Sequence, residues 1–267
     1  PATIAPHGMV VSPHALASEA GVEVLKAGGH AVDAAIATSA ALSVVYPHMT
    51  GVGGDAFWLI HDGATGKISY LNAAGQAASS ANIEWFRTNG HDTVPLRGVL
   101  PATLTVPGAV DGWCAAHKSF GRLPLARALA SAVDYAQNGF PVTRRLARHI
   151  AGCASEGAFN AAAARIFMPN GTPPTTGARL MNPDLAATLV QLGQGGRDAF
   201  YAESVGSALV RFAQSEGGFF DANDLHGQRS DWGEPLTGLY RGVTIFETPP
   251  PTQGFTVLEM LNLLEPY

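Results

Sequence analysis

The chain has 267 residues, of which 46% are hydrophobic and 14% charged, and its formal net charge is −5. This length suffices for one large globular unit. The charge excludes the basic surface of a nucleic-acid-binding protein, and the composition is not that of a disordered one. The 31 glycines and 18 prolines follow no period, so they exclude collagen and predict many tight turns.

The sequence contains no clear membrane or export signal. Polar residues interrupt the longest apolar stretch, Ala31–Tyr46, so no segment reaches the roughly 18 apolar residues of a transmembrane helix. The first residues also lack the basic and apolar regions of a signal peptide. We therefore expect a cytoplasmic protein with no membrane partner. A periplasmic location stays open if a signal peptide was removed before Pro1.

The first half of the chain predicts two helices and a β-hairpin. Ser12-Pro13 is typical of a helix start, with the serine as capping residue, and Gly28-Gly29 predicts the end of that helix. An alanine-rich helix should follow at Val32–Val45, where small side chains allow close packing. Phe57–His61 and Lys67–Leu71 flank a turn with two glycines and predict the two strands of the hairpin.

The second half predicts mostly helices. The pattern from Pro107 to about Gln194 is helical in short pieces, which include Ala126–Gln137 and Leu185–Leu192. A strand is expected at Gly242–Glu247, and a helix at Val257–Leu264. There is no internal repeat and no linker. Residues 1–267 therefore predict a single α+β unit.

The glycine-rich segment Gly51–Ala56 formally matches the dinucleotide-binding fingerprint G-x-G-x-x-G/A. That motif needs a strand before the glycines and a helix after them, so that the pyrophosphate meets a helix N-terminus. Here the predicted order is reversed. We interpret the segment as a tight turn, or as a surface that a ligand approaches closely, and we expect no cofactor.

A search for catalytic and metal-binding patterns finds no complete site. The nine histidines form no H-x-x-x-H pair, so no metal is expected, and His48 alone lies beside the glycine turn. There is no G-x-S-x-G elbow and no S-x-x-K. Cys114 lies near a predicted helix start, where the helix dipole lowers a thiol pKa, but a buried inert thiol is the favoured interpretation. The two cysteines, Cys114 and Cys153, predict no disulfide framework.

Taken in order, the motifs resemble the gamma-glutamyltranspeptidase family. The resemblance is colinear over nearly the whole chain, although each motif alone is weak. The matching segments are Gly8–Ser12, Gly21–Lys26, Ala27–Ala35, Val45–Phe57, Val106–Val110, Gly121–Pro124, Gly139–Val142, Asp198–Tyr201, Gly217-Gly218, Tyr240–Gly242, Pro249–Gly254 and Leu258–Glu265.

The resemblance implies an N-terminal-nucleophile hydrolase with a four-layer αββα sandwich. In such enzymes a precursor cleaves itself into a large and a small subunit, and the new N-terminal Thr of the small subunit attacks an amide. This chain resembles most of the large subunit, so we expect no catalytic residue on it. The expected partner is a small catalytic subunit from the same precursor, and a dimer of such heterodimers stays open.

Two departures from the family pattern concern the substrate. Family members that take γ-glutamyl substrates carry an Arg on the second hairpin strand that pairs with the substrate α-carboxylate. Ala74 stands at that position here, and a methyl group cannot replace a bidentate ion pair. Arg97 is an arginine further along the sequence that could take over this role, and the small subunit could also supply one. Asp55 occupies a position that is usually glycine.

The departures suggest a branch of the family with other amide substrates. The pattern of Tyr46–Gly51 with Phe57–Ile60 is most similar to the oxamate-amidohydrolase branch, which implies a small carboxylate-bearing amide as substrate. The expected substrate-binding residues are Asn72, Gln76, His48 and Asp55, because the two carboxamides carry donors and the other two flank the glycine turn. Three alternatives stay open: a cephalosporin-acylase-like enzyme, a true gamma-glutamyltransferase or glutathione hydrolase, and a non-catalytic scaffold homologue.

Overall fold

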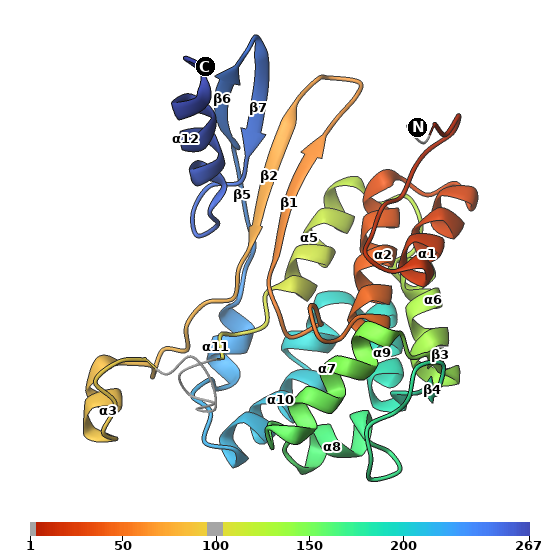
Figure 1. Ribbon diagram of the computed structural model, residues 1–267, viewed down its shortest axis with the longest axis vertical. Coiled ribbons are helices and arrows are strands. Elements are labelled where there is room, and N and C mark those ends of the chain that lie inside the picture. Colours follow the sequence, from red (N-terminus) through yellow and green to blue (C-terminus); the bar gives the residue numbers. More distant parts are fainter. Residues whose placement is uncertain (1–3, 95–103) are drawn as a thin grey trace.

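The computed structural model describes residues 4–94 and 104–267, which form a helical body and two β units beside it (Figure 1). The helices are α1 (Ala15–Lys26), α2 (Ala31–Val45), α3 (Ile83–Thr88), α5 (Ala109–Phe120), α6 (Leu125–Asn138), α7 (Arg144–Ser155), α8 (Ala161–Phe167), α9 (Pro183–Tyr201), α10 (Ser204–Ser215), α11 (Ala222–Gly227) and α12 (Gly254–Leu264). The strands are β1 (Ala56–His61), β2 (Ile68–Ala73), β3 (Phe140–Pro141), β4 (Arg179–Leu180), β5 (Asp231–Gly233), β6 (Leu236–Tyr240) and β7 (Val243–Glu247).

The capping residue predicted for the first helix is wrong. The helix begins at Ala15, and His14 caps it, because the His14 imidazole Nδ1 accepts from the Leu16 N–H (3.3 Å). Ser12 instead donates its hydroxyl to the His14 carbonyl (2.9 Å). The second helix starts in the same way, with His30 Nδ1 accepting from the Val32 N–H (3.3 Å). Both starts therefore rely on an imidazole where a hydroxyl is the commoner cap.

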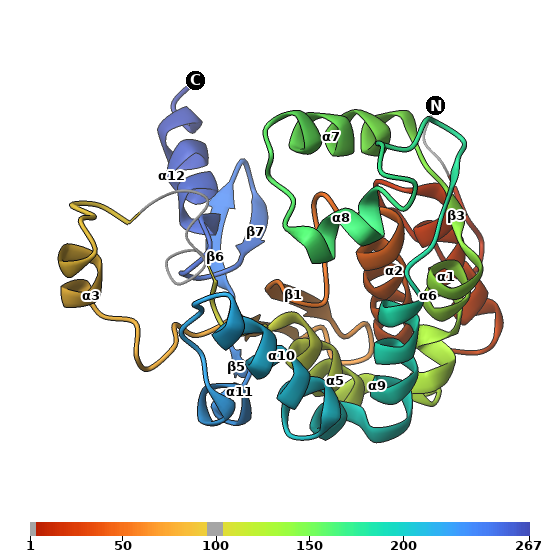
Figure 2. The same cartoon turned by 90° about the horizontal axis from the view of Figure 1, so that it is seen from below.

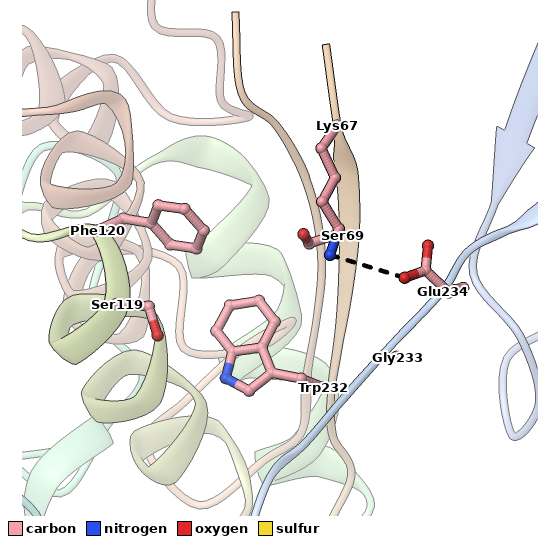
Figure 3. A pocket seen from close by; sticks show the side chains of 7 residues that line it. All are labelled: Lys67, Ser69, Ser119, Phe120, Trp232, Gly233 and Glu234. Carbon is pink, nitrogen blue, oxygen red and sulfur yellow. Dashed lines mark ion pairs between the residues drawn. The ribbon is translucent and has the colours of Figure 1, made fainter. Parts of the chain in front are cut away.

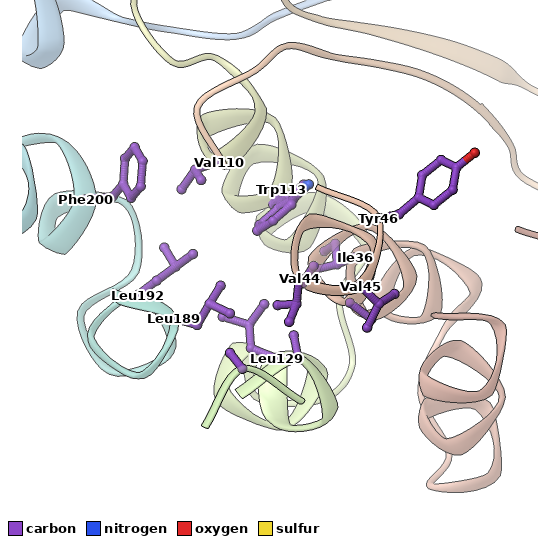
Figure 4. Close-up of a cluster of buried hydrophobic side chains, with 14 of the residues drawn as sticks. Ile36, Val44, Val45, Tyr46, Val110, Trp113, Leu129, Leu189, Leu192 and Phe200 are labelled. Atoms are coloured by element: carbon purple, nitrogen blue, oxygen red, sulfur yellow. The ribbon is translucent and has the colours of Figure 1, made fainter. Parts of the chain in front are cut away.

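The hydrophobic core lies around α2, which agrees closely with the predicted Val32–Val45 helix. Its alanines and β-branched residues are buried on nearly every side, because α1, α5 and α6 all pack against it. Figure 4 shows Ile36 and Val44 of this helix pointing toward Leu129 and Trp113. The small side chains of α2 allow this close approach of helices, as the sequence predicts.

The predicted hairpin is confirmed. Strands β1 and β2 pair antiparallel, with Ala56 opposite Ala73 and His61 opposite Ile68, and β5 adds a third strand beyond β2. Opposite residues share a face, so Trp58 and Leu71 face α5, whereas Phe57 and Asn72 lie on the other face. Figures 1 and 2 show this hairpin between the helical body and the unit of β6, β7 and α12.

Several elements differ from the sequence prediction in extent. The helix expected at Leu185–Leu192 is part of α9, which continues to Tyr201 across a kink at Gly196, where φ is 60°. The strand expected near the C-terminal end is β7, and its partner β6 was not predicted. Within the two described ranges, no helix combines the length and the apolarity that crossing a bilayer requires.

We expect Asp33→Ala to lower the free energy of unfolding by about 2–4 kcal/mol. The Asp33 carboxylate is fully buried and accepts from two backbone donors, the N–H groups of His30 (2.7 Å) and Arg122 (2.9 Å). Both donors would lose this acceptor in the variant. Chemical denaturation measures the change.

The matched control is Glu23→Ala, which removes an exposed ion pair with Lys26 and should change stability by less than about 0.5 kcal/mol. Equal effects of the two substitutions would contradict the structural role assigned to Asp33.

Candidate functional site

The segment Ala74–Gln76 leaves the end of β2 and is held by hydrogen bonds from three directions. The Ala74 N–H donates to Asn72 Oδ1 (3.0 Å), and the Gly75 N–H donates to Asp55 Oδ1 (2.6 Å). The Gln76 N–H donates to Gln228 Oε1 (3.1 Å), and the Gln76 carbonyl accepts from the Val106 N–H (2.9 Å). This segment, which the family resemblance assigns to the substrate carboxylate, is therefore fixed in place.

Gly75 has no room for a side chain. A Cβ atom at this position would lie 1.8 Å from the Val106 carbonyl oxygen and 2.8 Å from Thr105 Oγ1. The strand exit and the segment before α5 thus approach each other at backbone distance. Glycine is required here for packing, whatever the ligand.

Asn72 lies on the sheet face opposite to α5. Its register partners on the neighbouring strands are Phe57 on β1 and Asp231 on β5, so these three side chains share one face. Because Asn72 Oδ1 accepts from the Ala74 N–H, its Nδ2 amino group is turned away from that bond. Asp231 is exposed. Its strand, β5, has only three residues, which is too short for a periodic pattern that would predict the strand from the sequence.

The structure brings three of the four expected binding residues together. Asp55 contacts the Gly75 amide, while Asn72 and Gln76 flank Gly75 in sequence, and Asp55 and Gln76 are both exposed. The glycine turn joins the same region, because the Gly54 carbonyl accepts from the N–H of Ala109 (2.8 Å) at the start of α5. Their role as ligands of a substrate stays a prediction.

His48, the fourth expected residue, lies against α7 instead. Its ring centroid is 5.1 Å from that of His149, and both residues line a small cavity of about 80 Å³ with Cys153 and Phe167. Burial lowers the pKa of His48, and the neighbouring His149 and Arg145 lower it further. His48 is therefore a neutral imidazole near pH 7, in a pocket separate from the contacts of Gly75.

Gln228 is a site residue that sequence reasoning missed. It is fully buried between α11 and β5, and its Nε2 donates to the Ala74 carbonyl (3.0 Å) while its Oε1 accepts from Gln76. A single glutamine in a loop, more than 150 positions away from its partners, gives no motif or period. Only the folded chain identifies it.

A buried carboxylate, Asp111, holds the surroundings of Gln228. Asp111 accepts from Arg197 Nε (2.5 Å) on one oxygen and from the N–H and hydroxyl of Ser230 (both 2.6 Å) on the other. Arg197 also donates to the Gln228 carbonyl (2.5 Å). Helices α5 and α9 and the segment before β5 therefore meet at one ion pair.

Cys114 is the buried, inert thiol that the sequence favours. Burial and the nearby Asp111 raise its pKa to about 12, so these two effects outweigh any lowering of the pKa by the helix dipole. At neutral pH such a thiol is protonated and a poor nucleophile. Within the described residues, no group of three or more His, Cys, Asp or Glu side chains is placed to hold a metal ion.

A second hollow, of about 310 Å³, lies at the other end of the hairpin (Figure 3). Trp232 and Phe120 form its apolar wall with ring centroids 5.7 Å apart, and Lys67 faces Glu234 across its mouth with 3.8 Å between charged atoms. Lys67 precedes β2, whereas Asn72 lies near the end of that strand. The hollow is therefore distinct from the surroundings of Gly75.

Comparison with models of known protein families identifies the family of the chain. The family model described as Gamma-glutamyltranspeptidase matches residues 17–267. The chain belongs to this family. It is 42% identical over 259 residues to the glutathione hydrolase-like YwrD proenzyme of Bacillus subtilis. This match covers 97% of the chain and 49% of the relative. The chain is also 37% identical over 267 residues to the oxamate amidohydrolase proenzyme of Klebsiella pneumoniae, covering 98% and 50% of the two.

The chain spans about half the length of these curated relatives, including an acylase, the ACY 1 proenzyme of Pseudomonas, at 39% identity. Among solved structures, the gamma-glutamyltranspeptidase of Helicobacter pylori superposes with a TM-score of 0.93 at 30% identity, covering 100% of this chain and 77% of that one. The cephalosporin acylase of Bacillus halodurans gives 0.89 at 36% identity, with 94% and 48% coverage. The predicted α+β fold of the N-terminal-nucleophile hydrolases is confirmed.

We expect Gly75→Ala to destabilise the protein by about 1–3 kcal/mol, because its methyl group would overlap the Val106 carbonyl and force the backbone apart. Thermal unfolding measures the loss. Gly53→Ala is the matched control in the glycine turn: a Cβ there meets nothing within 4 Å. A neutral Gly75→Ala variant would disprove the close approach described above.

Proposed function

We propose that this chain is the large subunit of a self-cleaving amidohydrolase that acts on the amide of a small carboxylate-bearing substrate similar to oxamate. The nucleophile is the N-terminal Thr of a small subunit from the same precursor, and this chain supplies walls and orienting polar groups. The proposal rests on family membership together with one observation: the position of the family's carboxylate-binding Arg carries Ala74.

Neutral side-chain amides take the place of that arginine. Asn72 and Gln76 precede and follow Gly75 in sequence, and the N–H groups of Ala74, Gly75 and Gln76 all donate within the protein. Amides bind a carboxylate through single hydrogen bonds, which are weaker and less directional than a bidentate ion pair. Such a site suits a small substrate better than the larger γ-glutamyl group.

The two arginines that contact Gln228 are already bound. Arg197 is paired with Asp111 and donates to the Gln228 carbonyl, and Arg229 Nη1 donates to the carbonyls of His226 (2.5 Å) and Gln228 (2.6 Å). Arg197 cannot leave its partners without depriving the buried Asp111 carboxylate of its ion pair. Arg97, the other candidate from the sequence, lies outside the described residues.

A covering partner also agrees with the exposed apolar side chains. Phe57 and Leu59 on the outer face of β1 are 39% and 41% exposed, and Leu263 on α12 is 74% exposed. A second subunit that packs on these residues would remove them from water. We place the small subunit of the precursor there.

Purified full-length protein should cleave itself and release ammonia from oxamate with a higher kcat/KM than it shows for a γ-glutamyl anilide. Loss of the ion pair should cost about 2–5 kcal/mol of γ-glutamyl binding, or roughly 30-fold or more. Ala74→Arg should raise kcat/KM for the anilide, and Ala77→Arg, an exposed neighbour, should not.

A wild-type preference for the anilide would contradict the proposed substrate and favour a glutathione hydrolase. Preference for an aliphatic acyl amide would favour an acylase. Failure to self-cleave, with no hydrolysis of any of these amides, would favour a scaffold protein.

A further inference from the structure

One buried side chain, that of Gln228, bridges the two ends of the substrate-facing segment. Its Nε2 donates to the Ala74 carbonyl (3.0 Å) and its Oε1 accepts from the Gln76 N–H (3.1 Å). The partners are a carbonyl and an amide N–H, so their chemistry fixes the orientation of the carboxamide. Beyond the end of β2, the Gln228 side chain thus makes the pair of backbone hydrogen bonds that a neighbouring strand would make.

The backbone of Gln228 is held as firmly as its side chain. Its carbonyl accepts from Arg197 Nη2 (2.5 Å) and from Arg229 Nη1 (2.6 Å), and Arg197 is anchored in turn to Asp111. The residue is 0% exposed. A buried network in which each member has partners is rigid, and it transmits that rigidity to the segment it holds.

This arrangement decides which groups a substrate can meet. The N–H groups of Ala74, Gly75 and Gln76 donate to Asn72, Asp55 and Gln228 respectively, so the segment offers no free backbone donor. The donors left to a ligand are the side-chain amides of Asn72 and Gln76. Their positions depend on the backbone that Gln228 holds.

We propose that Gln228 is a positioning residue of the substrate site: it fixes the Ala74–Gln76 segment so that the carboxamides of Asn72 and Gln76 point at the substrate. The proposal rests on the proposed function for its substrate. It concerns this chain's own geometry and applies to any amide bound at the segment.

The test is steady-state kinetics of Gln228→Met in the processed, full-length enzyme. Methionine keeps the volume of the side chain and removes both hydrogen bonds. KM should rise about tenfold or more with kcat changed much less, because the variant loosens binding groups and leaves the nucleophile in place. Gln191→Met is the matched control, since Gln191 is an exposed glutamine on α9 with a hydrogen bond to Ser204 (2.6 Å). Its KM should stay at the wild-type value.

A double-mutant cycle separates positioning from a structural role. If Gln228 acts through Gln76, the combined Gln228→Met and Gln76→Ala variant should have about the KM of Gln228→Met alone. Additive effects on KM, or a lower melting temperature with an unchanged KM, would overturn the proposal. If the methionine variant does not fold, Gln228→Glu serves in its place: it loses the donor to the Ala74 carbonyl, and KM should again rise with kcat changed much less. Two variants that both fail to fold would assign Gln228 to the core and also overturn it.

Failure of the proposed function can be distinguished from failure of the proposal for Gln228. The cycle uses whichever amide the wild-type enzyme hydrolyses, so a preference for γ-glutamyl anilide leaves the Gln228 test intact. If no amide is hydrolysed, hydrogen exchange of the Gln76 amide replaces KM. Exchange should be at least about tenfold faster in Gln228→Met and unchanged in Gln191→Met. Equal exchange in all three proteins would overturn the proposal.

Discussion

The carboxylate of Asp111 is the constraint on which the candidate site depends. It is buried in α5, and it joins Arg197 of α9 to Ser230 of the segment before β5, three parts of the chain that are far apart in sequence. Two desolvated charges gain little net stability from one another, but either one alone would be costly to bury. The pair therefore determines how the three segments are arranged more than it determines how stable the fold is. Tyr201 completes the arrangement: its hydroxyl donates to the Pro107 carbonyl (2.7 Å), and burial raises its pKa so that it stays a donor.

The segment Ala74–Gln76 is held from two sides, one of which is linked to Asp111. Arg197 holds the carbonyl of Gln228, and Gln228 holds the backbone at Ala74 and Gln76. On the opposite side, Asp55 of the glycine turn binds the Gly75 amide. A short loop beyond the end of a strand would otherwise be free to move, and here each of its amides has a protein acceptor. A rigid segment costs less entropy when a ligand binds, which is the benefit of preorganisation for small substrates.

The sequence predicts the parts of the fold that depend on local signals. The α2 helix and the β1–β2 hairpin follow from apolar periodicity and turn residues, and both agree with the structure. One part that it misses depends on a distant partner, because β5 pairs with β2 although helices α3 to α11 lie between the two strands in sequence. It also misses the local caps at the first two helices, where imidazoles of His14 and His30 accept the hydrogen bonds. The same holds in the site. A motif and its neighbours predict that Asp55, Asn72 and Gln76 lie near one another, and their role as substrate ligands stays a prediction. The contact of Gln228 with this segment has no local pattern, and His48 is close to the turn in sequence but packs against α7.

Two glycines of α5 and of the segment before it are required for packing, and a residue kept for packing carries no information on the substrate. A Cβ at Gly108 would lie 2.3 Å from the Ala73 carbonyl, and one at Gly112 would lie 2.5 Å from the Ala73 side chain. A chain that keeps α5 against β2 needs small residues at these places, whatever its substrate. Ala74 is different, because the contact that holds it, the hydrogen bond from Gln228 Nε2, is made by its backbone carbonyl and not by its side chain. A change of side chain at this position therefore leaves the hydrogen bond from Gln228 in place, so this position can alter the ligand contacts of the segment without removing a backbone contact.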